Sequence, residues 1–362
     1  MSFKTWYIII ILSWVILKLA MRLKIMNLLL SKKSYLANLG LILFFVISLN
    51  ANAHHSHANL NANDIQTHRG IVEKYGWGMP HVYIKVKAPS QSGEIVLYNI
   101  ELLNPPGMLQ RGWDKDSLKV GDQIIWEGST DHNPKRYYSG LDWLEKADGT
   151  RLAMNAQVME ATASSDFSGL WMRDLRGGRP FYNPPEGWPY SELGKQMVAN
   201  FNENENPQVS CINPGIPKAT LLPYPMQITR PNADTFVFNY ELREYQRTIV
   251  LNQPKSQEEP SVLGSSVARM EGDKLIIETD NFIADRWGIH TGVDSSMQKH
   301  LVEEISLSED GKSLSLMMVV TDPVYLTEPV IINYHMRKIP DRALIQAPCT
   351  LESSRFFLDA GL

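Results

Sequence analysis

The chain has 362 residues, of which 35 are basic and 39 acidic, and its formal net charge at neutral pH is −4. The first 53 residues contain six of the basic residues and no acidic residue, so the remaining 309 residues carry a net charge of −10. This acidic balance argues against nucleic acid or anionic lipid as a partner, because like charges repel. A length of 309 residues exceeds one ordinary domain of roughly 100–200 residues, so we expect two domains.

Residues 1–53 have the pattern of an export leader. They hold two apolar runs of 14 residues, 6–19 and 36–49, and both are shorter than the roughly 20 residues of a membrane-spanning helix. Lys32 and Lys33 precede the second run, and Ala51 and Ala53 form the Ala-x-Ala pattern at which signal peptides are cleaved. We expect cleavage after Ala53 and a periplasmic or secreted product. The alternative is a protein that stays anchored to the membrane by these N-terminal hydrophobic segments.

Residues 64–163 are expected to form a small β-barrel. Runs rich in Val, Ile and Tyr at 70–75, 82–86, 95–103 and 123–128 alternate in part between apolar and polar residues, as half-buried strands do. About five or six short strands in about 100 residues favour a barrel. The order of a Gly-led first strand, an apolar second strand and a long loop resembles exported bacterial domains with the OB fold.

Residues 164–362 are expected to form a larger antiparallel β-barrel or sandwich, which makes the protein all-β. Strand patterns recur through this segment, and Gly272-Asp273 and Asp310-Gly311 supply tight turns between neighbours. One helix is expected at 191–201, with Ser191 as its N-cap. The start Gly169-x-Trp171 resembles the opening strand of lipocalins, in which a tryptophan closes one end of a barrel.

Cys211 and Cys349 are the only cysteines of the chain. Both follow the expected leader, and an exported protein reaches an oxidising compartment in which disulfides persist. Both also lie in segments that contain proline. We therefore expect a disulfide between Cys211 and Cys349, with two buried free thiols as the alternative.

The chain resembles an exported bacterial family of unknown function, on three motifs of the region after residue 53. These are His54-His55-Ser56, a Gly-led strand from Gly70, and Met79-Pro80-His81, which stands where the family has Asn-Pro-His. The second segment resembles exported domains without known activity through Gly264-Ser265-Ser266, the stretch from Glu271 to Thr279, and Asp322-Pro323. The resemblance implies export and architecture, and it implies no reaction.

Five of the nine histidines lie within 28 residues, at positions 54, 55, 57, 68 and 81. Imidazole nitrogen suits copper, zinc and nickel, and cleavage after Ala53 would leave His54 with both an amine and an imidazole. This arrangement resembles the histidine brace of copper monooxygenases. We therefore expect a copper-type metal site formed by His54, His57 and His81. The alternative is a polar N-terminus that binds metal only when metal is supplied.

Six residues of the larger barrel are expected to face a ligand because they are polar or aromatic and lie on or beside apolar strands. They are Trp171, Arg247, Glu271, His290, His300 and Glu303. His290 is expected on a loop at the mouth of the barrel, between Gly288-Ile289 and Thr291-Gly292. Either His290 or His300 beside Glu271 or Glu303 would provide a general acid and base.

These observations favour an exported binding protein of the cell envelope, which captures a small apolar or amphipathic molecule in the larger barrel and a copper-type metal at its N-terminus. An enzyme that uses a histidine and a carboxylate of the larger barrel is one alternative. A structural or partner-binding module is the other. The motifs of serine hydrolases, zinc proteases, thiol redox proteins and nucleotide-binding loops are not found in the sequence.

Overall fold

The computed structural model describes residues 59–154, 162–174, 184–242, 245–253, 259–345 and 347–359. The chain divides into two units between Ala53 and His54, and every described residue belongs to the second unit. That unit contains two β-barrels, so the expected all-β class is confirmed. No helix in the described ranges is long and apolar enough to cross a membrane.

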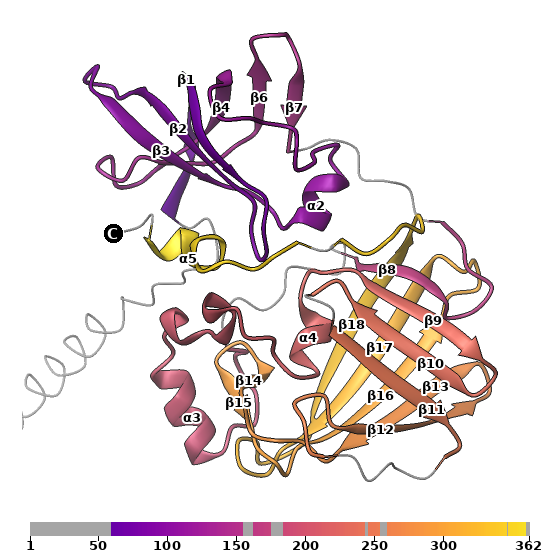
Figure 1. Ribbon diagram of the computed structural model, residues 1–362. Coiled ribbons are helices and arrows are strands. Elements are labelled where there is room, and N and C mark those ends of the chain that lie inside the picture. The colour runs from indigo at the N-terminus through magenta and orange to yellow at the C-terminus, as the bar shows by residue number, and fades with distance from the viewer. Residues whose placement is uncertain are drawn as a thin grey trace, which may run out of the picture. The chain divides into compact units, whose positions relative to one another are not determined.

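The first barrel is closed by five strands (Figure 1). Its sheet has the order β1-β2-β3-β5-β4-β6-β7, and an additional pairing of β1 with β4 closes the ring. The expected small OB-like barrel is confirmed. Its elements are β1 (Leu60–Gly76), β2 (Tyr83–Pro89), β3 (Ile95–Glu101), α2 (Pro105–Leu109), β4 (Gln123–Asp131), β5 (Tyr138–Ser139), β6 (Trp143–Lys146) and β7 (Arg151–Ala153).

Period-two alternation directs one face of each strand into this barrel. Ile84 and Val86 on β2, Ile100 on β3 and Trp126 on β4 are fully buried in one core. Glycine is needed at Gly70 on β1, because an added Cβ would lie 2.5 Å from the backbone oxygen of Lys87. Because β1 begins at Leu60, the expected strand led by Gly70 is the second part of a longer strand. Gly70 inside it allows close contact between β1 and β2.

The second barrel is closed by nine strands in the order β10-β11-β12-β13-β16-β17-β18-β8-β9. Its neighbours pair antiparallel, as expected, except that β11 and β12 are parallel. The strands are β8 (Gly169–Arg173), β9 (Met226–Asn232), β10 (Thr235–Tyr240), β11 (Tyr245–Leu251), β12 (Ser265–Glu271), β13 (Lys274–Asp280), β16 (His300–Leu307), β17 (Ser313–Thr321) and β18 (Val330–Ile339).

Shorter elements accompany the second barrel. They are α3 (Glu192–Ala199), the 3-10 helices η3 (Glu203–Glu205) and η4 (Pro207–Ser210), α4 (Lys218–Leu221), the hairpin of β14 (Asp285–His290) and β15 (Val293–Ser295), and α5 (Leu351–Asp359). The Ser191 side chain caps α3 by accepting a hydrogen bond from the Gly194 amide, as the sequence predicts. His290 belongs to β14 and is fully buried, which differs from the expected loop at the mouth of the barrel.

Side chains fill the interior of the second barrel. On β17 the buried residues Leu314, Leu316, Met318 and Val320 alternate with more exposed ones, and they join one continuous apolar core. Trp171 on β8 is fully buried in that core, and its indole nitrogen donates to the Phe167 carbonyl at 2.8 Å. Trp171 is therefore a packing residue of the barrel.

Residues 340–345 and 347–350, which we call the C-terminal strap, lead from β18 to α5. The guanidinium of Arg342 donates hydrogen bonds to the carboxylate of Glu241, beside the end of β10. Cys349 forms the expected disulfide with Cys211, which follows η4. The helix α5 then contacts the first barrel, where Phe356 stacks on Tyr83 with ring centroids 4.4 Å apart.

Replacing both cysteines, as Cys211→Ser with Cys349→Ser, should lower the free energy of unfolding by roughly 2–5 kcal/mol, because the bridge closes a loop of 138 residues in the unfolded chain. Urea titration followed by circular dichroism measures the change. Reduced wild-type protein is the matched control and should unfold at the same urea concentration as the double variant. An unchanged midpoint in the double variant would show that the bridge does not contribute to stability.

Candidate functional site

His81 lies in the loop before β2 and has one ring nitrogen fixed by acceptors. Its Nδ1 is 3.2 Å from a carboxylate oxygen of Glu101 and 3.2 Å from the backbone oxygen of Leu102. Both groups only accept hydrogen bonds, so in the neutral imidazole the proton is on Nδ1 and the lone pair is on Nε2. The His81 side chain is 27% exposed, whereas that of Glu101 is 9% exposed. His81 is thus held in one tautomer at the edge of the first barrel.

Tyr138 on β5 completes the support of His81. Its hydroxyl donates to the second carboxylate oxygen of Glu101 at 2.7 Å. Burial, and then the neighbouring charge of Glu101, raises the pKa of Tyr138 well above its usual value, so the phenol remains a donor. Tyr138 in turn packs with Tyr83 and Phe356. The buried cluster of Tyr138, Tyr83 and Phe356, the last on α5, therefore helps to fix the tautomer of His81 through Glu101.

The remaining expected metal ligands, His54 and His57, lie outside the described residues. The side-chain amide of Asn59 donates to Asp131 at 2.9 Å, and Leu60 packs against the cluster of Tyr83, Tyr138 and Phe356. The chain therefore enters the first barrel beside the residues that support His81. Within the described ranges, no three His, Cys, Asp or Glu side chains form a group that could hold a metal ion.

Two of the six expected ligand-facing residues form a buried ion pair. Arg247 on β11 lies 2.6 Å from Glu303 on β16, and the two side chains are 2% and 1% exposed. Arg247 also donates to Thr279 at 2.6 Å and to Ser266 at 3.0 Å. The pair and its hydrogen-bond partners link four strands of the barrel, β11, β12, β13 and β16, so the two buried charges compensate each other within the fold.

The other expected residues are not brought together with this pair. Glu271 is at the β12–β13 turn and bonds to the exposed Arg269 at 2.7 Å. His300 is at the start of β16, paired with Thr321. His290 packs edge-on against Trp188, 5.4 Å between ring centroids. Its pKa is lowered to about 2 by burial and then by the charge of Lys218, so the imidazole is neutral.

The burial of two lysines was not predicted from the sequence, because nothing in their local pattern distinguishes them from surface lysines. Lys218 on α4 donates to Thr291, and Lys299 donates to the Ile216 carbonyl at 2.7 Å and to Ser295 at 3.1 Å. Lys299 also lies over the ring of Phe282, 4.1 Å from its centroid. Burial lowers the pKa of each lysine to about 8. Both lysines bind residues of, or next to, the β14–β15 hairpin.

Comparison with known proteins gives one informative match. A model of a family of unknown function, DUF6152, matches residues 43–139. The matched region contains the histidine cluster and runs from before β1 to the end of β5 (Tyr138–Ser139), so it includes His81, Glu101 and Tyr138. It confirms a likeness to a family of unknown function over this part of the chain. No curated protein and no solved structure matches the chain.

Because of the two buried lysines, the free energy of unfolding should change with pH in the alkaline range. The pKa of each lysine in the folded protein is about 8, below the ordinary lysine value of 10.5, so between these values the unfolded chain keeps a proton that the folded chain has lost. The free energy of unfolding should therefore rise between pH 8 and pH 10, by up to roughly 3 kcal/mol per lysine. Lys218→Met and Lys299→Met should each flatten this rise in urea titrations across the range.

The matched control is Lys195→Met, since Lys195 is a solvent-exposed lysine on α3. It should show the same pH dependence as the wild type. A wild-type protein whose stability is flat or falls between pH 8 and pH 10 would contradict the assignment of both lysines.

Proposed function

We propose that this protein is an exported binding protein of the cell envelope whose first barrel takes part in a copper-type metal site. His81 supplies one ligand through Nε2, and His54 and His57 supply the others. The observation that carries the proposal is the hydrogen bonding of His81, whose Nδ1 is directed to Glu101 and the Leu102 carbonyl. Histidines that bind metals commonly donate their other ring proton to a carboxylate or a backbone carbonyl, which fixes the free nitrogen toward the metal.

The length of the chain is compatible with this ligand set. His57 is two positions before Asn59, a span of at most about 7 Å, and His54 is five positions before it, a span of at most about 17 Å. Asn59 is bonded to Asp131, and the next residue packs on the cluster that contains Tyr138. Both histidines therefore precede, by at most five positions, a residue that is bonded beside the cluster that supports His81.

The donor set favours copper, zinc or nickel over magnesium or calcium, because all the proposed ligands are imidazole nitrogens. Copper is proposed because cleavage after Ala53 would add an N-terminal amine to His54. Support for export is the order of Lys32-Lys33, the apolar run 36–49 and the Ala-x-Ala pattern. The metal site thus rests on processing as well as on folding.

Two further parts of the expected function have weaker support. Capture of an apolar or amphipathic molecule inside the larger barrel would have to displace the side chains that fill it. An enzyme using His290 or His300 would need a free carboxylate, whereas Glu303 is bonded to Arg247 and Glu271 to Arg269. A structural or partner-binding module agrees with the filled barrel but gives no role to the support of His81.

The test is copper binding by protein expressed from the full-length sequence, with its first residue determined by intact mass. Isothermal titration with Cu²⁺, and electron paramagnetic resonance to count nitrogen ligands, should show one site. His81→Ala should weaken binding about 100-fold or more and remove one nitrogen ligand. Glu101→Gln should weaken it roughly 10–100-fold, because the carboxylate that orients the imidazole is lost.

The matched control is His335→Ala, which removes an exposed histidine of β18 in the other barrel. It should bind Cu²⁺ as the wild type does. Copper binding that is the same in His81→Ala as in the wild type would refute the site. Titrations with Zn²⁺ and Ni²⁺ show whether the imidazole set prefers another metal, and a preference for zinc over copper would overturn the assignment of copper.

A further inference from the structure

The loop that carries His81 is held by the C-terminal strap. The amide of Met79 donates to the Pro348 carbonyl at 3.0 Å, and Met79 and Cys349 form a parallel β-bridge. Ser353, on α5, donates to the carbonyl of Met79. Met79 itself is 1% exposed and belongs to the apolar core of the second barrel. The backbone two residues before His81 is therefore fixed from outside the first barrel.

The disulfide of Cys349 with Cys211 is the covalent anchor of this part of the strap. Cys211 follows η4, so the bridge fixes Cys349 relative to η4. Beside it, the Ser354 hydroxyl donates to the Val209 carbonyl of η4 at 2.9 Å. The helix α5 has nine residues, and isolated helices shorter than about 12–15 residues are marginal in water. The position of α5 therefore depends on these anchors.

Two routes connect the disulfide to the imidazole of His81. One is the backbone, from the bridged end of the strap through Met79 to His81. The other is packing, because Phe356 of α5 shares a buried cluster with Tyr138, whose hydroxyl donates to Glu101. The Glu101 carboxylate lies 3.2 Å from Nδ1 of His81. Loss of the disulfide would loosen both routes at their common origin.

The disulfide is placed where thiol reagents can approach it. Both cysteines are partly exposed, and Ile212, next to Cys211, is 55% exposed. Pro348 and Thr350, on either side of Cys349, are exposed as well. Because exposed disulfides exchange with thiols more readily than buried ones, this bridge can form and break in the folded protein.

We propose that the Cys211–Cys349 disulfide is a redox switch that positions His81 for copper. This inference rests on the proposed function, because it concerns regulation of the same metal site. In the switching step the two thiols give two electrons and two protons to a disulfide donor. The bond between Cys211 and Cys349 forms, and the donor is released as two thiols. The chain therefore gains its full affinity for copper in an oxidising compartment, where such bonds form and persist.

The test compares the oxidised full-length expressed protein with the double variant Cys211→Ser and Cys349→Ser, which has no thiol to bind or reduce copper. In the absence of metal, long-range ¹H–¹⁵N NMR should show the His81 ring of the oxidised wild type with its proton on Nδ1. The double variant should show an exchanging mixture of tautomers. Isothermal titration with Cu²⁺ should give at least 10-fold weaker binding in the double variant, as expected when a ligand loses its support. Wild type that is reduced and alkylated with iodoacetamide should match the double variant.

The matched control is Leu316→Ala, a buried position on β17 whose truncation also lowers stability. It should keep the Nδ1 tautomer and the copper affinity of the wild type, which separates positioning of His81 from a general loss of stability. Ser353→Ala keeps the disulfide and removes the hydrogen bond to Met79. It should weaken copper binding in the same direction, and it tests the backbone route even if the double variant fails to fold.

Equal tautomers or equal copper affinity in the oxidised wild type and the folded double variant would overturn the switch. If the double variant does not fold, copper binding by Ser353→Ala that equals that of the wild type overturns it instead. If the oxidised wild type binds no copper, the proposed function fails. Tautomers that still differ between the two forms then support positioning of His81 by the disulfide, and equal tautomers overturn that as well.

Discussion

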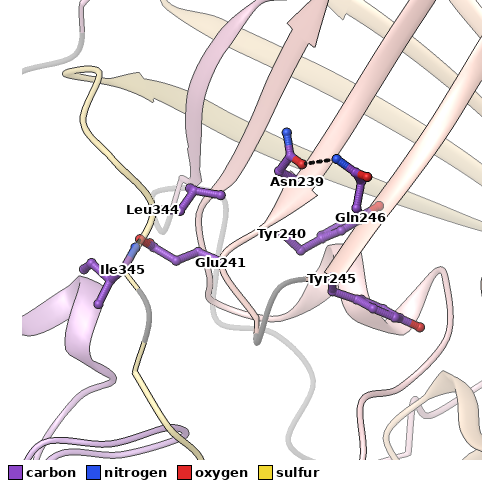
Figure 2. A pocket seen from close by; sticks show the side chains of 7 residues that line it. All are labelled: Asn239, Tyr240, Glu241, Tyr245, Gln246, Leu344 and Ile345. Atoms are coloured by element: carbon purple, nitrogen blue, oxygen red, sulfur yellow. Dashed lines mark hydrogen bonds between the residues drawn. The ribbon is translucent and has the colours of Figure 1, made fainter.

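Glu241 is a buried carboxylate held by Arg342 and by the backbone amide of Ile345, and this contact fixes the C-terminal strap on the second barrel. A few residues later the disulfide of Cys349 with Cys211 fixes the strap again. Breaking the first contact would leave a carboxylate buried without its partner, which typically costs several kcal/mol. Leu344 and Ile345 of the strap, with Glu241, also line a cavity of about 240 Å³ beside β10 and β11 (Figure 2).

The strap leads directly to α5, and α5 packs against residues of the proposed metal site. Ser353 donates to the Met79 carbonyl, two residues before His81, and Glu352 binds Lys85 at 3.1 Å. Phe356 packs with Tyr83 and Tyr138, whose hydroxyl orients Glu101. Residues more than 250 positions apart in sequence therefore support one histidine. A change in α5 is expected to reach His81 through packing, without any contact to its imidazole.

Local patterns in the sequence were sufficient to predict the all-β class, two barrels, the N-cap of α3 and the disulfide. Apolar alternation and glycine-containing turns depend on neighbours in the chain, and the disulfide depends on the number of cysteines and on the compartment. These signals can therefore be interpreted without a structure. The pairing of Arg247 with Glu303, the support of His81 by Glu101 and the burial of Lys218 and Lys299 depend on register between distant strands and loops. Nothing in the chain near these residues encodes that register. For the same reason, the cavity between β10, β11 and the strap was not expected.

In the described part of the second barrel, the one parallel pair of strands, β11 and β12, is held by few backbone pairs. Among the described residues the two strands share two backbone pairs, Val250 with Val267 and Leu251 with Ala268. Beside them Arg247 bridges to Ser266 and Thr279 and to Glu303, so side chains carry bonding that a ladder provides elsewhere. Amide protons at this junction should exchange with solvent before those of β16 and β17, which share eight pairs. We therefore expect the barrel to open first at this junction, which the hydrogen bond from Arg247 to Ser266 bridges.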